Sequence, residues 1–179
     1  ILSDGDTVLV LATGRFCVGW GEMAEGLGAS VETIDFGDSD AVDLTQVEAV
    51  LKADTAGRIK AVLTGLVDTS TGVLNDIKGI RAAIDNAGHG ALLMCDAIAS
   101  LGCDEYHMDD WGVDITVAAS QKGLMTPPGI GFVWFNDKAD AVRETNNLVS
   151  KYWDWRPRVA GDEYWKFFGI WSRVTEEAL

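Results

Sequence analysis

A lysine in this sequence combines reactive chemistry with an unusual position. Lys122 lies in the segment Ser120–Gly129, between the apolar runs 115–119 and 130–135. Lysine is rarely buried without a partner. Desolvation between two core strands would lower the pKa of its amine and make it a usable nucleophile. A loop lysine that points to water is the ordinary alternative, and for a lysine taken alone the commoner one.

An aspartate follows another apolar run. Asp96 comes directly after Leu92–Cys95, and a carboxylate that leaves a buried strand needs a partner to offset its desolvation. A turn or helix-capping aspartate is the ordinary interpretation. The functional one is a carboxylate that faces a protonated pyridine nitrogen, as pyridoxal phosphate chemistry requires, because the protonated ring accepts electrons from the substrate.

The elements that must position these two residues follow from hydrophobic patterning. Short continuous apolar runs are typical of strands covered on both faces, and 3.6-residue periodicity is typical of helices. Together they predict an α/β fold with a mostly parallel sheet flanked by helices. We expect strands at Thr7–Leu11, Val31–Phe36, Ile59–Leu66, Ala91–Met94, Val113–Ala119 and Ile130–Phe135, and helices at Trp20–Leu27, Asp43–Ala53, Asp76–Gly88 and Asp137–Asn146.

Four residues of different chemistry follow predicted strands. They are Phe16, Thr69, Asp96 and Lys122. Ligands of parallel α/β sheets bind at the carboxyl ends of the strands. We therefore expect these side chains to converge on one crevice.

Two segments resemble a known family. Residues 91–102 and 120–129 are similar to the two central motifs of the class-V pyridoxal-phosphate aminotransferases of the alanine/serine/aspartate–glyoxylate type. Lys122 follows Asp96 by 26 residues, which agrees with that family. The turn 69–74 resembles the family's Ser/Thr-Gly-Val turn. The resemblance extends over about residues 1 to 150, and several motifs in register are more specific than any single motif.

The resemblance implies the fold-type-I large domain, the cofactor pyridoxal 5′-phosphate, and a role for each motif residue. Lys122 would carry the cofactor as a Schiff base and then move the proton at the substrate α-carbon. The remaining contacts would come from Asp96 on the ring nitrogen, Phe16 and Ile98 on the two ring faces, Thr69 on the phenolic oxygen and Gln121 on the phosphate.

Each cofactor contact has an ordinary alternative from the residues alone. Phe16 and Ile98 could be plain core residues, since apolar side chains need no ligand to be buried. Thr69 could stabilise its own turn through a side-chain hydrogen bond. Gln121 could be an amide that faces solvent.

The implied activity is transamination from aspartate, serine or alanine to a 2-oxo acid, with glyoxylate as the acceptor. A desulfurase or lyase of the same fold and a non-catalytic scaffold are the alternatives, because the family's phosphate loop and its carboxylate-binding arginine are not recognisable here. Arg156 and Arg158 are the candidate carboxylate ligands. Residues 1–150 would form the cofactor-binding domain, and the aromatic tail 151–179 would lead toward a small domain or a homodimer interface.

Composition narrows the classes of partner. The chain has 14 Lys and Arg against 28 Asp and Glu, a net charge of −14, which argues against nucleic acid or an anionic membrane as the partner. No apolar stretch is long enough to span a bilayer. The three cysteines are odd in number and lack metal-ligand spacing, so we expect free thiols, no metal site and a reducing compartment, the cytoplasm.

Overall fold

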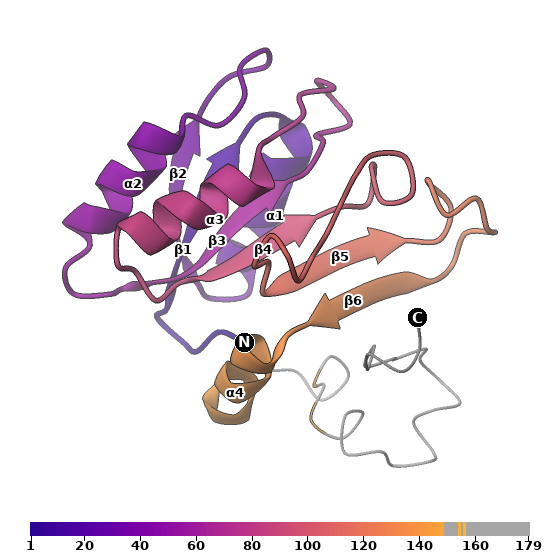
Figure 1. Cartoon of the computed structure of the whole chain (residues 1–179). Helices are drawn as coiled ribbons and strands as arrows, with labels where there is room; N and C mark the ends of the chain where they lie inside the picture. Colours follow the sequence, from indigo (N-terminus) through magenta and orange to yellow (C-terminus); the bar gives the residue numbers. More distant parts are fainter. Residues whose placement is uncertain (149–153, 155, 157–179) are drawn as a thin grey trace.

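A computed structural model of the 179-residue chain describes residues 1–148, 154 and 156. Within these residues one six-stranded sheet has the order β2-β1-β3-β4-β5-β6 (Figure 1). Strands β1 to β5 are parallel and β6 runs antiparallel to β5. This confirms the predicted mostly parallel sheet. The strands are β1 Thr7–Ala12, β2 Ser30–Asp35, β3 Ile59–Gly65, β4 Leu92–Asp96, β5 Ile115–Ala119 and β6 Gly131–Phe135.

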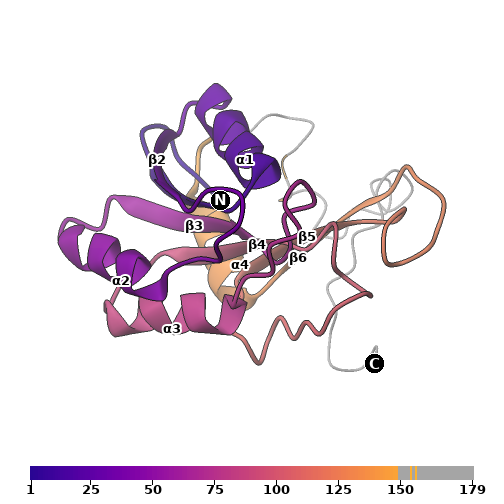
Figure 2. The same cartoon turned by 90° about the horizontal axis from the view of Figure 1, so that it is seen from above.

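Helices cover both faces of the sheet, which explains the continuous apolar runs of its central strands. Figure 2 shows α1 on one face and α2 and α3 on the other. Val8 of β1 packs with Ala24 of α1 and Ala139 of α4, whereas Leu9 belongs to the cluster that contains Ile80 of α3. Neighbouring residues of β1 are thus buried against opposite layers. The helices are α1 Arg15–Gly26, α2 Leu44–Ala53, α3 Ile77–Asn86 and α4 Asp137–Thr145.

Three helices begin at a local side-chain cap. Asp43 Oδ1 accepts a hydrogen bond from Thr45 N at 2.9 Å at the start of α2, and Asp76 Oδ1 accepts one from Gly79 N at 2.8 Å at the start of α3. Asn136 caps α4 in the same way. Such caps satisfy backbone donors that the first helical turn leaves open. The predicted starts of these three helices are confirmed.

Helix α1 begins five residues earlier than predicted. We expected the helix to start at Trp20, but α1 starts at Arg15. Gly14 offers no side-chain cap, and Asp68 supplies one instead: its Oδ2 accepts from Phe16 N at 2.9 Å and from Cys17 N at 3.0 Å. This cap lies more than 50 residues along the chain, so no local pattern could predict it.

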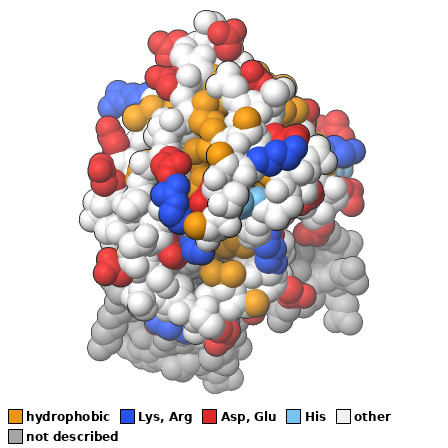
Figure 3. Space-filling model, turned by 90° about the vertical axis from the view of Figure 1, so that its left-hand side faces the viewer, with side chains coloured by type: hydrophobic (Ala, Val, Ile, Leu, Met, Phe, Trp, Pro, Cys, Tyr) orange, Lys and Arg blue, Asp and Glu red, His pale blue; other side chains and the backbone are white. Residues whose placement is uncertain are grey.

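One face of the molecule carries both positive and negative side chains. Figure 3 faces the left-hand side of Figure 1 and shows acidic and basic side chains intermixed, with hydrophobic atoms between them. Among the described residues, no helix is long and apolar enough to cross a membrane.

Candidate active site

The parallel strands bring the predicted residues to one edge of the sheet. Strands β1, β3, β4 and β5 are mutually parallel through the sheet, so their carboxyl ends lie at the same edge. Phe16 follows β1, Thr69 follows β3, Asp96 ends β4 and Lys122 follows β5. The chain therefore has its aromatic, hydroxyl, carboxylate and amine candidates at the edge where α/β sheets bind ligands.

Asp96 is a half-buried carboxylate whose desolvation is not fully offset by the hydrogen bond and the positive charge near it. Burial raises the pKa of its carboxyl, and the charge of Asp68 raises it further, while the Ile98 backbone N–H and the charge of Lys122 act in the opposite direction. Ile98 N donates to Asp96 Oδ1 at 2.8 Å. Within the described part of the chain, Asp96 Oδ2 accepts no hydrogen bond. The fold therefore leaves an acceptor at this edge that favours a cationic donor.

Lys122 is exposed, so its position is that of the ordinary alternative, a loop lysine, and not that of a lysine buried between two core strands. The reason is that Lys122 lies in the turn between β5 and β6, beyond the ends of both strands. The turn itself is well fixed. Ser120 Oγ donates to Pro127 O at 2.6 Å, and Met125 N donates to Lys122 O at 2.9 Å.

Gly123 holds the lysine turn against the loop that follows Asp96. A Cβ at Gly123 would overlap the carbonyl oxygen of Leu101, and one at Gly102 would lie 3.0 Å from Gly123 O. Only glycine permits so close an approach of two backbones. This contact keeps Lys122 near the β4 loop, in agreement with the electrostatic effect of its ammonium group on Asp96.

Phe16 and Ile98 are not ordinary core residues. Phe16 is 52 % exposed at the start of α1, and Ile98 is half-buried. Neither side chain belongs to the two hydrophobic clusters found in the described residues. Both therefore present apolar surface at the carboxyl edge that a flat ligand could cover.

Thr69 and Gln121 keep their polar groups available. Both are exposed, and neither side chain forms a hydrogen bond within the described residues. The turn around Thr69 is stabilised by its neighbours instead: Ser70 Oγ donates to Asp68 Oδ1 at 2.7 Å, and Thr71 Oγ1 donates to Thr13 O at 2.8 Å. The alternative interpretation of Thr69 as the turn-stabilising hydroxyl thus applies to Ser70 and Thr71.

Asp68 is the residue at this edge that the sequence did not single out. It is 1 % exposed and accepts four hydrogen bonds, from Phe16 N, Cys17 N, Ser70 N and Ser70 Oγ. Its place before a run of hydroxyl residues is a signal for a side-chain-stabilised turn. Its contact with α1 has no local signal.

Only one of the two candidate arginines can be placed, because Arg158 lies outside the described residues. Arg156 forms a two-pronged ion pair with Asp154, with Nε to Oδ1 at 2.9 Å and Nη2 to Oδ2 at 2.9 Å, and its Nη1 lies 3.5 Å from Asn146 O, just beyond α4. Their role as carboxylate ligands stays a prediction.

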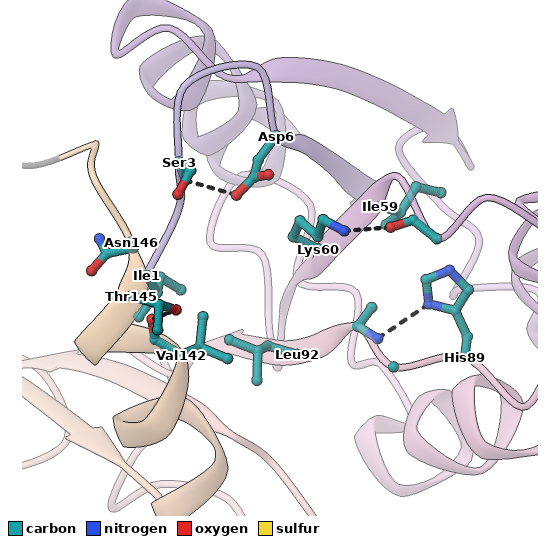
Figure 4. Close-up of a pocket in the computed structure, with 13 residues that line it drawn as sticks. Ile1, Ser3, Asp6, Ile59, Lys60, His89, Leu92, Val142, Thr145 and Asn146 are labelled. Atoms are coloured by element: carbon teal, nitrogen blue, oxygen red, sulfur yellow. Dashed lines mark hydrogen bonds between the residues drawn. The ribbon is translucent and has the colours of Figure 1, made fainter.

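Two cavities lie at opposite edges of the sheet. One, of about 380 Å³, is lined by Ile59 and Leu92, the first residues of β3 and β4 (Figure 4). Lys60 donates there to the Gly57 carbonyl at 2.6 Å, and His89 Nδ1 accepts from Ala91 N at 3.1 Å, so both side chains are used by the backbone. The other cavity, of about 1000 Å³, lies beside Phe16 and α1 at the carboxyl edge.

Among the described residues, no group of three or more His, Cys, Asp or Glu side chains is arranged so that it could hold a metal ion. The three cysteines are free thiols, as predicted, with Cys17 and Cys95 buried and Cys103 exposed. Burial raises the pKa of Cys95 to about 12 and also raises that of Cys17. Neither buried thiol is therefore suited to act as a nucleophile.

Comparison with known proteins gives a consistent result. The family model "Aminotransferase class-V" matches residues 1–152. The L-aspartate–glyoxylate aminotransferase of Paracoccus denitrificans is 39 % identical over 160 residues, 89 % of this chain and 40 % of that protein. The serine–glyoxylate aminotransferase of Hyphomicrobium methylovorum is 39 % identical over 146 residues, 82 % of this chain and 36 % of that protein.

A solved structure agrees with these sequence relatives. The crystal structure of an alanine–glyoxylate aminotransferase from Nostoc sp. matches with a TM-score of 0.80 at 26 % identity, and the match covers 99 % of this chain and 43 % of that one. The chain spans about 40 % of the length of the curated relatives it matches. The fold-type-I transferase fold expected from the sequence is confirmed, and the chain belongs to the class-V aminotransferase family.

Proposed function

We propose that this chain supplies the cofactor-binding residues of an aminotransferase that uses pyridoxal 5′-phosphate. The observation that carries the proposal is the half-buried Asp96, whose raised pKa and open Oδ2 leave it in need of a cationic donor at the edge that also holds Lys122. In this proposal residues 1–150 form the cofactor-binding domain, and Arg156 and Arg158 remain candidates for the substrate carboxylate.

The residues at the carboxyl edge fit the cofactor. A protonated ring nitrogen would give Asp96 Oδ2 both a hydrogen bond and a compensating charge. Phe16 and Ile98 offer apolar surface for the two ring faces. Thr69 offers an unused hydroxyl for the phenolic oxygen, and Gln121 an unused amide for the phosphate.

The chemistry follows from what each side chain can hold or move. When bound, pyridoxal phosphate withdraws electrons from the α-carbon of an amino acid and so makes its C–H bond acidic. Asp96 would keep the ring nitrogen protonated, which preserves that electron withdrawal. The Lys122 amine would bind the cofactor covalently and, once released, would act as the general base and acid that moves the proton at the α-carbon.

The substrate class is inferred from the relatives. The two described above are named for aspartate or serine as the amino donor and glyoxylate as the acceptor. We infer the same acceptor here and a small amino acid as donor. A homodimer is inferred from the family, and a reducing compartment such as the cytoplasm is inferred from the free thiols.

Cofactor binding is the first test. Pyridoxal phosphate is titrated into the purified protein, and the visible absorbance of the covalently bound form is recorded. Lys122→Ala should abolish this band. Lys78→Ala is the matched control, because Lys78 is an exposed lysine on α3 and should leave the band unchanged. A wild-type protein that gives no band at high cofactor concentration would reject the proposal.

Turnover is the second test. Glyoxylate is offered with aspartate, serine or alanine, and the formation of glycine is measured. Sulfide release from cysteine instead would identify the desulfurase alternative. Cofactor binding without turnover of any donor would identify the non-catalytic scaffold.

A further inference from the structure

The geometry points to Asp68 as a positioning residue that places the aromatic and the hydroxyl contacts of the cofactor site through two loops. This inference rests on the proposed function. Asp68 itself is buried and has no surface to offer a ligand. It acts through Phe16 on one side and Thr69 on the other.

One carboxylate oxygen fixes the start of α1. Asp68 Oδ2 accepts from Phe16 N at 2.9 Å and from Cys17 N at 3.0 Å. These are first-turn donors that no residue of α1 or of the preceding loop satisfies. A Cβ at Gly14 would lie 2.5 Å from Asp68 Cγ, so the missing side chain at Gly14 is what lets the carboxylate reach the helix.

The other oxygen fixes the turn that carries Thr69. Asp68 Oδ1 accepts from Ser70 N at 3.0 Å and from Ser70 Oγ at 2.7 Å. Ser70 Oγ in turn accepts from Arg15 N at 2.9 Å. Asp68 and Ser70 thus tie the turn after β3 to the start of α1, and Thr69 lies between them with its hydroxyl free.

Asp68 also acts on the site through its charge. Burial alone would raise the pKa of this carboxyl, but the hydrogen bonds from Ser70 and Cys17 outweigh burial and lower it, so the group stays ionised. Its negative charge is one cause of the raised pKa of Asp96. The ionised Asp68 thereby makes a cationic partner beside Asp96 more favourable.

The variant Asp68→Asn tests whether Asp68 positions the cofactor contacts or only caps α1. The amide keeps the size of the side chain but has one accepting oxygen, so it cannot serve α1 and the Ser70 turn together. We expect the affinity for pyridoxal phosphate to fall about tenfold, the effect of losing one buried hydrogen bond to a charged acceptor. Asp43→Asn is the matched control, because Asp43 also accepts two backbone N–H groups at a helix start, on α2.

The experiment compares wild type, Asp68→Asn and Asp43→Asn by three measurements. Hydrogen exchange of the cofactor-free protein should speed up at Phe16 and Cys17 only in Asp68→Asn. Absorbance titration should give the tenfold loss of cofactor affinity only in that variant. Visible circular dichroism at saturating cofactor should change in Asp68→Asn and not in Asp43→Asn, because this signal reports how the side chains around the bound chromophore are arranged.

The possible results are distinct. Unchanged affinity and dichroism in Asp68→Asn, with a normal wild-type band, overturn this inference alone. A wild-type protein without a band overturns the proposed function and this inference together. If Asp68→Asn does not fold, Ser70→Ala takes its place, since it removes one bond to the same carboxylate; a loss of about threefold supports the inference, and none overturns it.

Discussion

Replacing Asp96 with asparagine should have opposite effects on the stability of the cofactor-free protein and on cofactor binding. Asparagine keeps the oxygen that accepts from Ile98 N and removes the charge. That charge is opposed by burial and by the neighbouring charge of Asp68, and only partly offset by Lys122. Without the cofactor, the ionised Asp96 therefore lowers the free energy of unfolding, and the uncharged asparagine does not.

The pH dependence of this effect has a definite sign. Because folding raises the pKa of Asp96, the unfolded chain loses this proton first as the pH rises. The penalty is absent below the unfolded pKa of about 3.9 and is complete above the folded pKa. Asp96→Asn should thus be more stable than wild type at neutral pH, and the difference should vanish in acid.

Typical magnitudes make the two effects measurable. Removing an unfavourable charge commonly stabilises a protein by about 0.5–2 kcal/mol, and about 1 kcal/mol shifts the melting temperature of a chain of this size by about 2–4 °C. Loss of a hydrogen bond to a charged group costs about 1.5–3 kcal/mol, or roughly a ten- to hundredfold weaker affinity for pyridoxal phosphate.

Thermal unfolding with and without pyridoxal phosphate measures both effects in one assay. Wild type should gain stability with the cofactor by mass action, and Asp96→Asn should start higher and gain less. Either of two results would contradict these roles of Asp96: a variant no more stable than wild type at neutral pH, or a variant whose cofactor-induced gain equals that of wild type.

Three further predictions concern the loops and helix around the site. The lowered pKa of Asp68 contributes stability that is present above the unfolded pKa and is lost as the pH falls through the folded pKa, so the stability gap between wild type and Asp68→Asn should close in acid unfolding curves. Gly19→Ala should raise the stability by about 1 kcal/mol in thermal unfolding, because a Cβ there meets open space within α1. Gly123→Ala should weaken cofactor incorporation about tenfold in absorbance titration, because its Cβ would displace the lysine turn from Leu101.

Local patterns were sufficient where the determining contacts are local. The continuous apolar run of β1 predicts a strand buried on both faces, and Val8 and Leu9 are indeed buried against different layers. Asp43 and Asp76 mark the starts of α2 and α3 because a cap acts on residues two or three positions away. Alternation of such elements predicts parallel strands, which in turn place Asp96 and Lys122 at one edge.

The sequence could not predict features set by distant residues. The start of α1 depends on Asp68, which reaches Phe16 from the loop after β3. The exposure of Lys122 depends on how the turn between β5 and β6 packs, which the apolar runs on either side of it do not reveal. The buried Asp68 escaped notice for the same reason, since its partners on α1 are adjacent only after folding.

The two carboxylates at this edge, Asp68 after β3 and Asp96 at the end of β4, have different partners. Asp68 occupies the N-terminus of α1 and uses the Phe16 and Cys17 N–H groups, which would otherwise be a natural anion site. A cofactor phosphate must then find its donors elsewhere, and the exposed amide of Gln121 is one of the side chains at this edge that are free to supply one. Within residues 1–148, no helix N-terminus donates to Asp96, and its pKa moves in the opposite direction from that of Asp68. The fold thus satisfies one negative charge internally and leaves the other for a cation, the requirement that a protonated ring nitrogen meets.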